Sequence, residues 1–439
     1  MLGMLLVNFS AGYPVYPTIL RHSHDYCSYA DTIMPQFLFA AGFAMRLSLG
    51  KRFDTGGKMP WGRAVRRIMG LALVAIVWYS ICDLNGVIDK FKRLPTGEFA
   101  KPLGVSLVEL FKREFFQTLL HIAATSLWIL PVIAASSKVR VWFMIASGSI
   151  HLFLSWWFNF DWVNSDPTGI DGGPLGFFSW AVPALCGTLA CDAVRSTGPL
   201  ADTRDTTRAA RRIAIYGLAV AALGWVMSIP TVLYNVHSDH TPTDNPKTVI
   251  QPAENPAATG ATPKPVMKPR NEKFAPDPVI PSMARIRAWD GTLVEPPFVR
   301  PPGPELRKWN YWMMSQRSGN LSYLTFAAGI SLVVYALFLW VCDSKGWRLG
   351  LFRTLGTNSL AAFLLHDVAG WLVEPFFPKQ GTILTASGAQ WIQLHSGFDP
   401  DRSLFLMRVA ETSIGFLCFA LFVYGICRLL ERMGWYLRV

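Results

Sequence analysis

The chain has 439 residues, of which 51% are hydrophobic and only 16% are charged. Soluble domains have about 25% charged residues, so this composition excludes an ordinary soluble globular protein and indicates a membrane protein. The net charge of +12 would also suit binding to nucleic acid. However, the basic residues cluster in loops between apolar segments, where they favour contact with an anionic inner leaflet. We therefore expect a lipid bilayer as a partner and no nucleic acid.

Ten apolar segments predict the helices of the fold. Most of them lack charged residues over lengths that approach the roughly 20 residues needed to cross a bilayer. Residues 1–13 are too few to span at about 1.5 Å per residue, so we interpret them as the outer half of a helix that upstream residues would complete. The sequence predicts an all-α, polytopic transmembrane helix bundle of about ten helices, at residues 1–13, 32–45, 68–82, 118–134, 141–158, 175–191, 213–234, 318–342, 354–366 and 412–427.

Composition divides the chain into three parts. Residues 1–234 contain seven of the expected helices, and residues 318–439 contain the last three. Between them, residues 235–317 hold half of the chain's 30 prolines and show no apolar periodicity. Such a stretch buries too little surface to offset its ordering entropy, so we expect an extended, Pro-rich extramembrane insert. The distribution of Lys and Arg places both termini inside and the insert outside, which is the periplasm for a bacterial inner membrane.

A polar segment with two histidines precedes one of the expected helices. Residues 19–31 read ILRHSHDYCSYAD and contain His22, His24 and Asp31. Histidine is the side chain best suited to exchange a proton near neutral pH, and Asp31 could fix the tautomer of an imidazole. The segment therefore predicts a catalytic base in a loop that faces outward. The alternative is that both histidines are solvated loop residues, and the residues alone favour neither interpretation.

The loop at residues 51–67 carries basic residues at the expected inner face. Three of them, Arg63, Arg66 and Arg67, recur at helical spacing. The pattern is typical of an inner-face anchor. The orientation rule favours this anchor, but the pattern is also compatible with phosphate groups of a cytosolic ligand, bound through charge-assisted hydrogen bonds. No spacing typical of a metal site occurs, so no metal is expected.

Three further features rank below the histidine loop. His121 and His151 each lie within an expected helix, where ionisable residues are functional candidates by default. The acidic segment 159–173 contains the turn signals Asp166-Pro167 and Gly172-Gly173. We expect this segment to be a solvated outer loop.

Several motifs resemble one family of membrane enzymes. These are VNF at residues 7–9, LRHS at 20–23, the pattern AD-x-x-x-P-x-F-x-F-x-x-G at 30–42, NLSYLTF at 320–326 and GTNSL at 356–360. In this order they resemble the catalytic domain of the heparan-alpha-glucosaminide N-acetyltransferase family, over nearly the whole chain apart from the Pro-rich insert. The resemblance implies a multi-helix enzyme that takes acetyl groups from cytosolic acetyl-CoA and delivers them to a glucosamine-type amine across the membrane.

The same resemblance assigns roles to individual residues. It places the active histidine at His22, with His24 as an extra candidate, and the assisting asparagine at Asn8. Acyl transfer to an amine needs a base or an acyl carrier, and a donor for the developing oxyanion. An imidazole and the Asn8 amide would meet these needs. A homodimer is compatible with this interpretation.

Two other functions stay open at this stage. One is O-acetylation of an envelope polysaccharide at the same site. The other is transport of a small solute, although no matched pair of broken hydrophobic segments of the kind found in inverted-repeat transporters is evident.

Overall fold

The computed structural model describes residues 1–54, 60–82, 108–195, 203–236, 273–379 and 381–437. In these residues the regular structure is helical, and two isolated β-bridges join Asn235 to Arg307 and Phe274 to Trp309. The longer helices are α1 (Leu2–Ser10), α2 (Ile33–Asp54), α3 (Trp61–Cys82), α6 (Thr118–Ile129), α7 (Ser137–Leu154), α9 (Phe177–Arg195), α10 (Thr203–Met227), α12 (Leu321–Phe338), α13 (Gly350–Thr357), α14 (Ser359–Val373), α15 (Ile383–Ser396) and α16 (Pro400–Arg432). Two short helices are α8 (Phe160–Asn164) and α11 (Met283–Arg287).

The bundle contains six helical segments that are long and apolar enough to cross a membrane, within the described ranges. They are Ala30–Gly50, Ser137–Asn164, Gly173–Arg195, Thr203–Tyr234, Leu321–Ser344 and Pro400–Arg432. Two shorter apolar helices span Thr118–Val132 and Ser359–Val373. The all-helical class expected from the sequence is therefore confirmed, with the character of a multi-pass membrane protein. Each of the ten apolar segments overlaps a helix, but ten membrane crossings stay a prediction.

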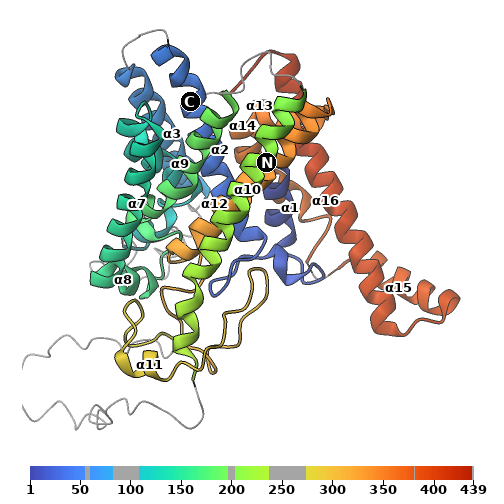
Figure 1. Ribbon diagram of the computed structural model, residues 1–439. Coiled ribbons are helices and arrows are strands. Elements are labelled where there is room, and N and C mark those ends of the chain that lie inside the picture. The colour runs from blue at the N-terminus through green and yellow to red at the C-terminus, as the bar shows by residue number, and fades with distance from the viewer. Residues whose placement is uncertain (55–59, 83–107, 196–202, 237–272, 380, 438–439) are drawn as a thin grey trace, which may run out of the picture.

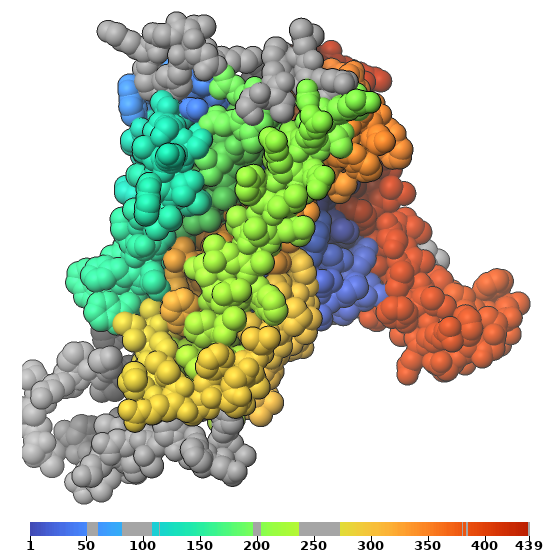
Figure 2. All heavy atoms as spheres, in the orientation of Figure 1, coloured from blue at the N-terminus to red at the C-terminus, as the bar shows by residue number. Residues whose placement is uncertain are grey.

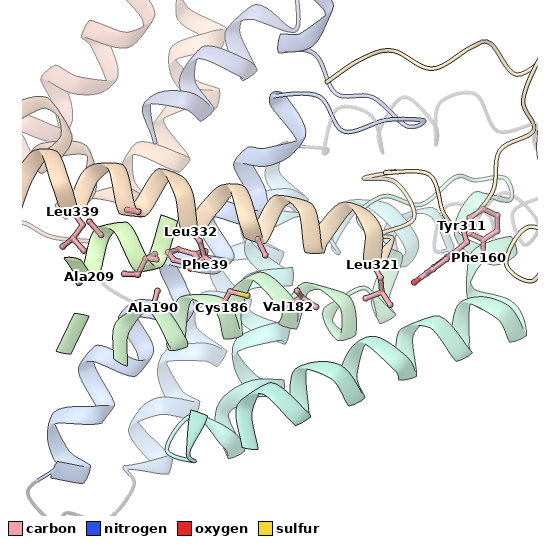
Figure 3. Close-up of a cluster of buried hydrophobic side chains, with 14 of the residues drawn as sticks. Phe39, Phe160, Val182, Cys186, Ala190, Ala209, Tyr311, Leu321, Leu332 and Leu339 are labelled. Carbon is pink, nitrogen blue, oxygen red and sulfur yellow. The ribbon is translucent and has the colours of Figure 1, made fainter. Parts of the chain in front are cut away.

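Glycines let the central helices pack closely. A Cβ atom at Gly42 of α2 would lie 1.9 Å from the carbonyl oxygen of Ala184, and one at Gly187 of α9 would lie 2.0 Å from that of Phe39. Helices in a bilayer commonly associate through such small residues, because backbones can then approach. Figure 3 shows the neighbouring apolar cluster, in which Val182, Cys186 and Ala190 of α9 lie along one side of α12.

Helix α2 connects the two ends of the bundle. It follows the histidine loop directly and ends just before α3, which carries Arg63, Arg66 and Arg67 in its first turns. With 22 residues, α2 extends over about 33 Å. The histidine loop and the arginines of α3 therefore lie at opposite ends of α2 (Figure 1).

The second half of the insert packs against the bundle instead of extending freely into solvent. Residues 273–317 bury Ala275, Tyr311 and Met313, and Tyr234 donates a hydrogen bond from its hydroxyl to the carbonyl oxygen of Asp277 (2.8 Å). Figure 2 shows residues near 280–300 packed at one end of the bundle. The backbone N–H of Phe298 donates to the carbonyl oxygen of Cys27 in the histidine loop at 3.2 Å. The expectation of an extended insert with little buried surface is wrong for this half, and residues 237–272 lie outside the described part of the chain.

Helix α15 and the first turns of α16 form an arm that projects from the bundle (Figure 1), whereas Phe419, Val423 and Cys427 in the later part of α16 are buried in a core cluster with α1 and α14. Helix α16 has 33 residues and is about 50 Å long, so it exceeds the roughly 20 residues of one membrane crossing. The apolar segment 412–427 marks only its central part. The first turns of α16 contain Arg402, Arg408 and Glu411. These charged residues explain why the apolar segment predicted from hydropathy does not include the first turns of the helix.

Candidate functional site

His22 and Asp31 meet where the histidine loop runs into α2. The Nδ1 atom of His22 lies 2.9 Å from Oδ1 of Asp31. The other carboxylate oxygen of Asp31 accepts hydrogen bonds from the backbone N–H (2.9 Å) and hydroxyl (2.8 Å) of Ser28, and from the backbone N–H of Ser23 (3.3 Å). The Asp31 side chain is fully buried, whereas 41% of the His22 side chain is exposed. The pair therefore consists of a fixed carboxylate and an accessible imidazole.

Helix α12 holds the backbone beneath this pair. The hydroxyl of Tyr323, a fully buried residue, donates a hydrogen bond to the backbone carbonyl oxygen of Asp31 at 2.6 Å. Asn320, which precedes the first turn of α12, donates from its amide to the carbonyl oxygen of Met313 (2.9 Å). These contacts place the segment NLSYLTF directly behind the His22–Asp31 pair.

A second carboxyl group lies close to His22. Asp171 is 2% exposed and adopts a left-handed backbone conformation with φ 55°. Its Oδ1 accepts a hydrogen bond from Nε2 of Gln316 at 3.1 Å. Burial raises the pKa of Asp171 to about 7, although Gln316 and the charge of His22 act in the opposite direction. The site thus contains a carboxyl group that titrates near neutral pH beside the imidazole.

The two loop histidines differ in their electrostatic surroundings. Burial lowers the pKa of His22, but the hydrogen bond and charge of Asp31, with smaller effects of Asp171 and Gln316, outweigh it and raise the pKa overall. For His24, burial and the positive charges of Arg317, His22 and Arg113 lower the pKa to about 4. His24 is therefore neutral at physiological pH, and its buried Nδ1 has no hydrogen-bond partner in the described residues. Only His22 is paired with a carboxylate.

The remaining residues selected from the sequence lie elsewhere. Asn8 is exposed on α1, and no hydrogen bond joins it to His22 or His24 in the described structure. Arg63, Arg66 and Arg67 are exposed in the first turns of α3, at the opposite end of α2. The structure therefore brings His22 and Asp31 together, keeps His24 close to His22, and leaves Asn8 and the three arginines apart from the pair.

The two helix histidines are buried among aromatic rings. His121 has no exposed surface, lies 6.0 Å from Trp180 between ring centroids, and has no partner for either ring nitrogen in the described residues. His151 is equally buried, and its Nδ1 lies 3.0 Å from the hydroxyl of Tyr311. Within the described part of the chain, no hydrogen bond or ring contact joins either histidine to the His22–Asp31 pair.

Sequence reasoning missed three residues of the site. Asp171 belongs to the segment 159–173 that we expected to be a solvated loop, and the structure buries it. Gln316 belongs to the insert, whose composition gave no indication of a packed end. Tyr323 lies in a recognised motif but had no assigned role. The Gly172-Gly173 pair was the available sequence signal, because glycines favour a turn with positive φ, and the structure shows positive φ at both glycines and at Asp171.

No protein-family model matches the chain, and no curated protein matches it. The structure itself defines the class, a helical protein whose described residues include six candidate membrane spans. At one end of its bundle, a buried carboxylate orients an accessible histidine. In the described residues, no group of three or more His, Cys, Asp or Glu side chains is placed to hold a metal ion.

Proposed function

We propose that this protein is a membrane acetyltransferase that moves an acetyl group from cytosolic acetyl-CoA to the amine of an amino sugar in a glycan on the outer side. The observation that carries the proposal is the His22–Asp31 pair, in which a fully buried carboxylate holds Nδ1 of a partly exposed imidazole at 2.9 Å. The motifs shared with the heparan-alpha-glucosaminide N-acetyltransferase family support the same assignment. The proposed setting is a bacterial inner membrane with the histidine loop in the periplasm.

The pair has the arrangement that general base catalysis requires. Because Asp31 accepts the proton on Nδ1, the neutral ring keeps Nε2 free to accept another. In the proposed reaction, the acceptor amine attacks the thioester carbonyl, a C–N bond forms, and the C–S bond breaks as CoA leaves. The proton released by the amine passes to Nε2 of His22, and the imidazolium that results is stabilised by Asp31. The ring can then give this proton to the departing thiolate.

The proposed donor site is at the other end of α2. Arg63, Arg66 and Arg67 of α3 would bind the phosphates of acetyl-CoA by charge-assisted hydrogen bonds. The length of α2, about 33 Å, separates these arginines from His22. The proposal therefore requires the donor to reach into the bundle from the arginine end while the acceptor approaches from the histidine end.

Labelled acetyl-CoA and a panel of amino sugars test the proposal in membranes that contain the full chain. We expect label in an amide of the acceptor, and its loss in His22→Ala. Arg66→Ala should instead weaken donor binding by about 1.5–3 kcal/mol and leave transfer from saturating donor intact. Label in an ester of a polysaccharide would indicate O-acetylation, and label that stays on CoA would indicate a transporter. Normal transfer by His22→Ala would refute the proposed role of the pair.

A further inference from the structure

Two guanidinium groups share one carboxylate at the end of the bundle opposite His22. Arg46 of α2 donates from Nε and Nη2 to Asp192 of α9 at 2.7 and 3.2 Å, and from Nη1 to the carbonyl oxygen of Ile133 at 2.8 Å. Arg140 of α7 also donates from Nη2 to Asp192. The side chains of Arg46 and Asp192 are 15% and 24% exposed, and that of Arg140 is fully buried. Two positive charges thus face one negative charge.

Arg140 is incompletely satisfied at this position. Its Nε donates to the carbonyl oxygen of Ala135 at 3.2 Å, and its Nη2 donates to the hydroxyl of Ser137 at 3.2 Å. Its Nη1 is buried without a hydrogen-bond partner within the described ranges. A buried guanidinium with an unpaired N–H group is costly. A further hydrogen-bond acceptor with negative charge would satisfy it.

The same guanidinium lies against the first turn of α7, an 18-residue helix. The first backbone N–H groups of a helix have no partner within the helix and carry a partial positive charge. In α7, the hydroxyl of Ser136 accepts from the N–H of Val139 at 3.5 Å, while Ser137 and Lys138 remain exposed. The turn therefore offers free backbone amide donors near the guanidinium of Arg140, which contacts Ser137, and it carries one exposed cation, Lys138.

Other cations increase the positive potential at this end. The first turns of α3 pack against the same region, because Ala64 and Val65 share an apolar cluster with Ile133 and with Met45 beside Arg46. These turns carry the exposed Arg63 and Arg66. A phosphate is bound readily by helix N-terminal amides combined with guanidinium groups.

We propose that the first turn of α7, backed by Arg140 and Arg46, is a binding site for a phosphate group. The amides of the first turn and Lys138 contact the anion, and Arg140 supplies the donor that lacks a partner. The site lies at the same end of α2 as Arg63 and Arg66, to which the proposed function assigns the phosphates of acetyl-CoA, but its evidence is the contacts of Arg140 and Arg46, which do not depend on acetyl transfer. The phosphate belongs either to a soluble ligand or to the headgroup of an anionic lipid, and both present the same chemistry to this turn.

Two measurements on the purified full chain distinguish these sources. Inorganic pyrophosphate is titrated into protein in an uncharged detergent, with binding followed by calorimetry. Separately, the protein is reconstituted with phosphatidylglycerol or phosphatidylcholine, and the lipid retained after detergent extraction is measured by native mass spectrometry. Both measurements are repeated on Lys138→Glu, which changes an exposed side chain, and on Arg140→Gln. Arg208→Gln is the matched control, since Arg208 is an exposed cation in the first turns of α10.

Lys138→Glu is expected to weaken binding of the phosphate probe at least about tenfold, while Arg208→Gln binds as the wild type does. Arg140→Gln should weaken binding of the phosphate probe to a similar extent, provided that this variant folds. If Arg140→Gln does not fold, the result for Lys138→Glu decides the test. Pyrophosphate binding without selective lipid retention assigns the site to a soluble phosphate, and selective retention of phosphatidylglycerol assigns it to a headgroup. The proposal is overturned if the wild type neither binds pyrophosphate nor selectively retains phosphatidylglycerol. It is also overturned if Lys138→Glu and Arg208→Gln lose equal amounts of binding.

Discussion

The substitution Asp31→Asn exchanges one carboxylate oxygen for an NH₂ group and keeps the shape of the side chain. Because the backbone N–H and hydroxyl of Ser28 donate to Oδ2 at 2.9 and 2.8 Å, the amide oxygen of the variant must take that position. The NH₂ group then faces Nδ1 of His22, which lies 2.9 Å from Oδ1 in the wild type. An amide nitrogen only donates, so Nδ1 becomes an acceptor and the ring proton moves to Nε2.

In this tautomer Nε2 can no longer accept a proton from the acceptor amine. The corresponding change in a serine protease lowers kcat by about 10⁴-fold, and we expect a loss of about 10³–10⁴-fold in acetyl transfer here. The variant also loses the hydrogen bond and charge that raise the pKa of His22. A base works in its neutral form, so wild-type activity should rise as pH passes upward through that pKa. Any residual activity of the variant should persist at lower pH.

The assay is the initial rate of labelled acetyl transfer by purified full-length protein across the neutral pH range. Asp401→Asn makes the same chemical change at an exposed position in the first turn of α16 and should leave the rate unchanged. The N–H and hydroxyl groups that donate to Asp31 keep an acceptor in the variant, so folding is expected to be preserved. Transfer by Asp31→Asn at the wild-type rate, with the wild-type pH profile, would refute the assignment of His22 as an oriented base.

Three other predictions concern separate parts of the molecule. His24→Ala should retain most transfer activity, because burial lowers the pKa of His24 to about 4 and no carboxylate pairs with it among the described contacts; an inactive variant would make His24 the base. Burial raises the pKa of Asp171 from 3.8 to about 7, so the folded state binds the proton more tightly. The free energy of unfolding of the wild type should therefore fall by up to about 4 kcal/mol relative to that of Asp171→Asn as pH rises from about 4 to 7. Thermal unfolding of both proteins in detergent across this pH range measures the difference. An equal dependence of stability on pH in the two proteins would contradict the burial of Asp171. Gly42→Ala places a Cβ 1.9 Å from the carbonyl oxygen of Ala184 and should lower the free energy of unfolding by at least about 1–3 kcal/mol. Gly62→Ala, which has open space around its Cβ, should leave stability unchanged. Equal thermal unfolding of the two variants would argue against the close α2–α9 contact.

The helices were predictable because a bilayer imposes one strong rule on the sequence. A segment that crosses hydrocarbon must be apolar and must bond its own backbone, so charge-free windows mark helices directly. The rule fails at the ends, where charged side chains can reach water. Helix α16 continues through Arg402 and Arg408 for three turns before the apolar window, and α3 begins with its arginines.

The site was less predictable because its chemistry depends on contacts between distant segments. His22 and Asp31 are nine residues apart, and their pairing was visible as a motif. Asp171 becomes a buried carboxyl group only when Gln316 and the backbone of Arg317 cover its loop, since Gly172 donates to the carbonyl oxygen of Arg317 at 2.9 Å. Proline content suggested that residues near Gln316 were extended. The composition of a segment does not report which surface it packs against.

The bond from Tyr323 to Asp31 joins residues 292 positions apart, and this separation sets an order of events during synthesis. When the first helices leave the ribosome, His22 and Asp31 are already next to each other, but the backbone of Asp31 still lacks its partner. Gln316 is made at the end of the insert, after α10, and Tyr323 only after the whole insert. Closing so long a loop is slow compared with local helix formation. The nascent chain therefore carries an unfinished site through most of its translation, and the site is completed only when the second half of the protein has entered the bundle.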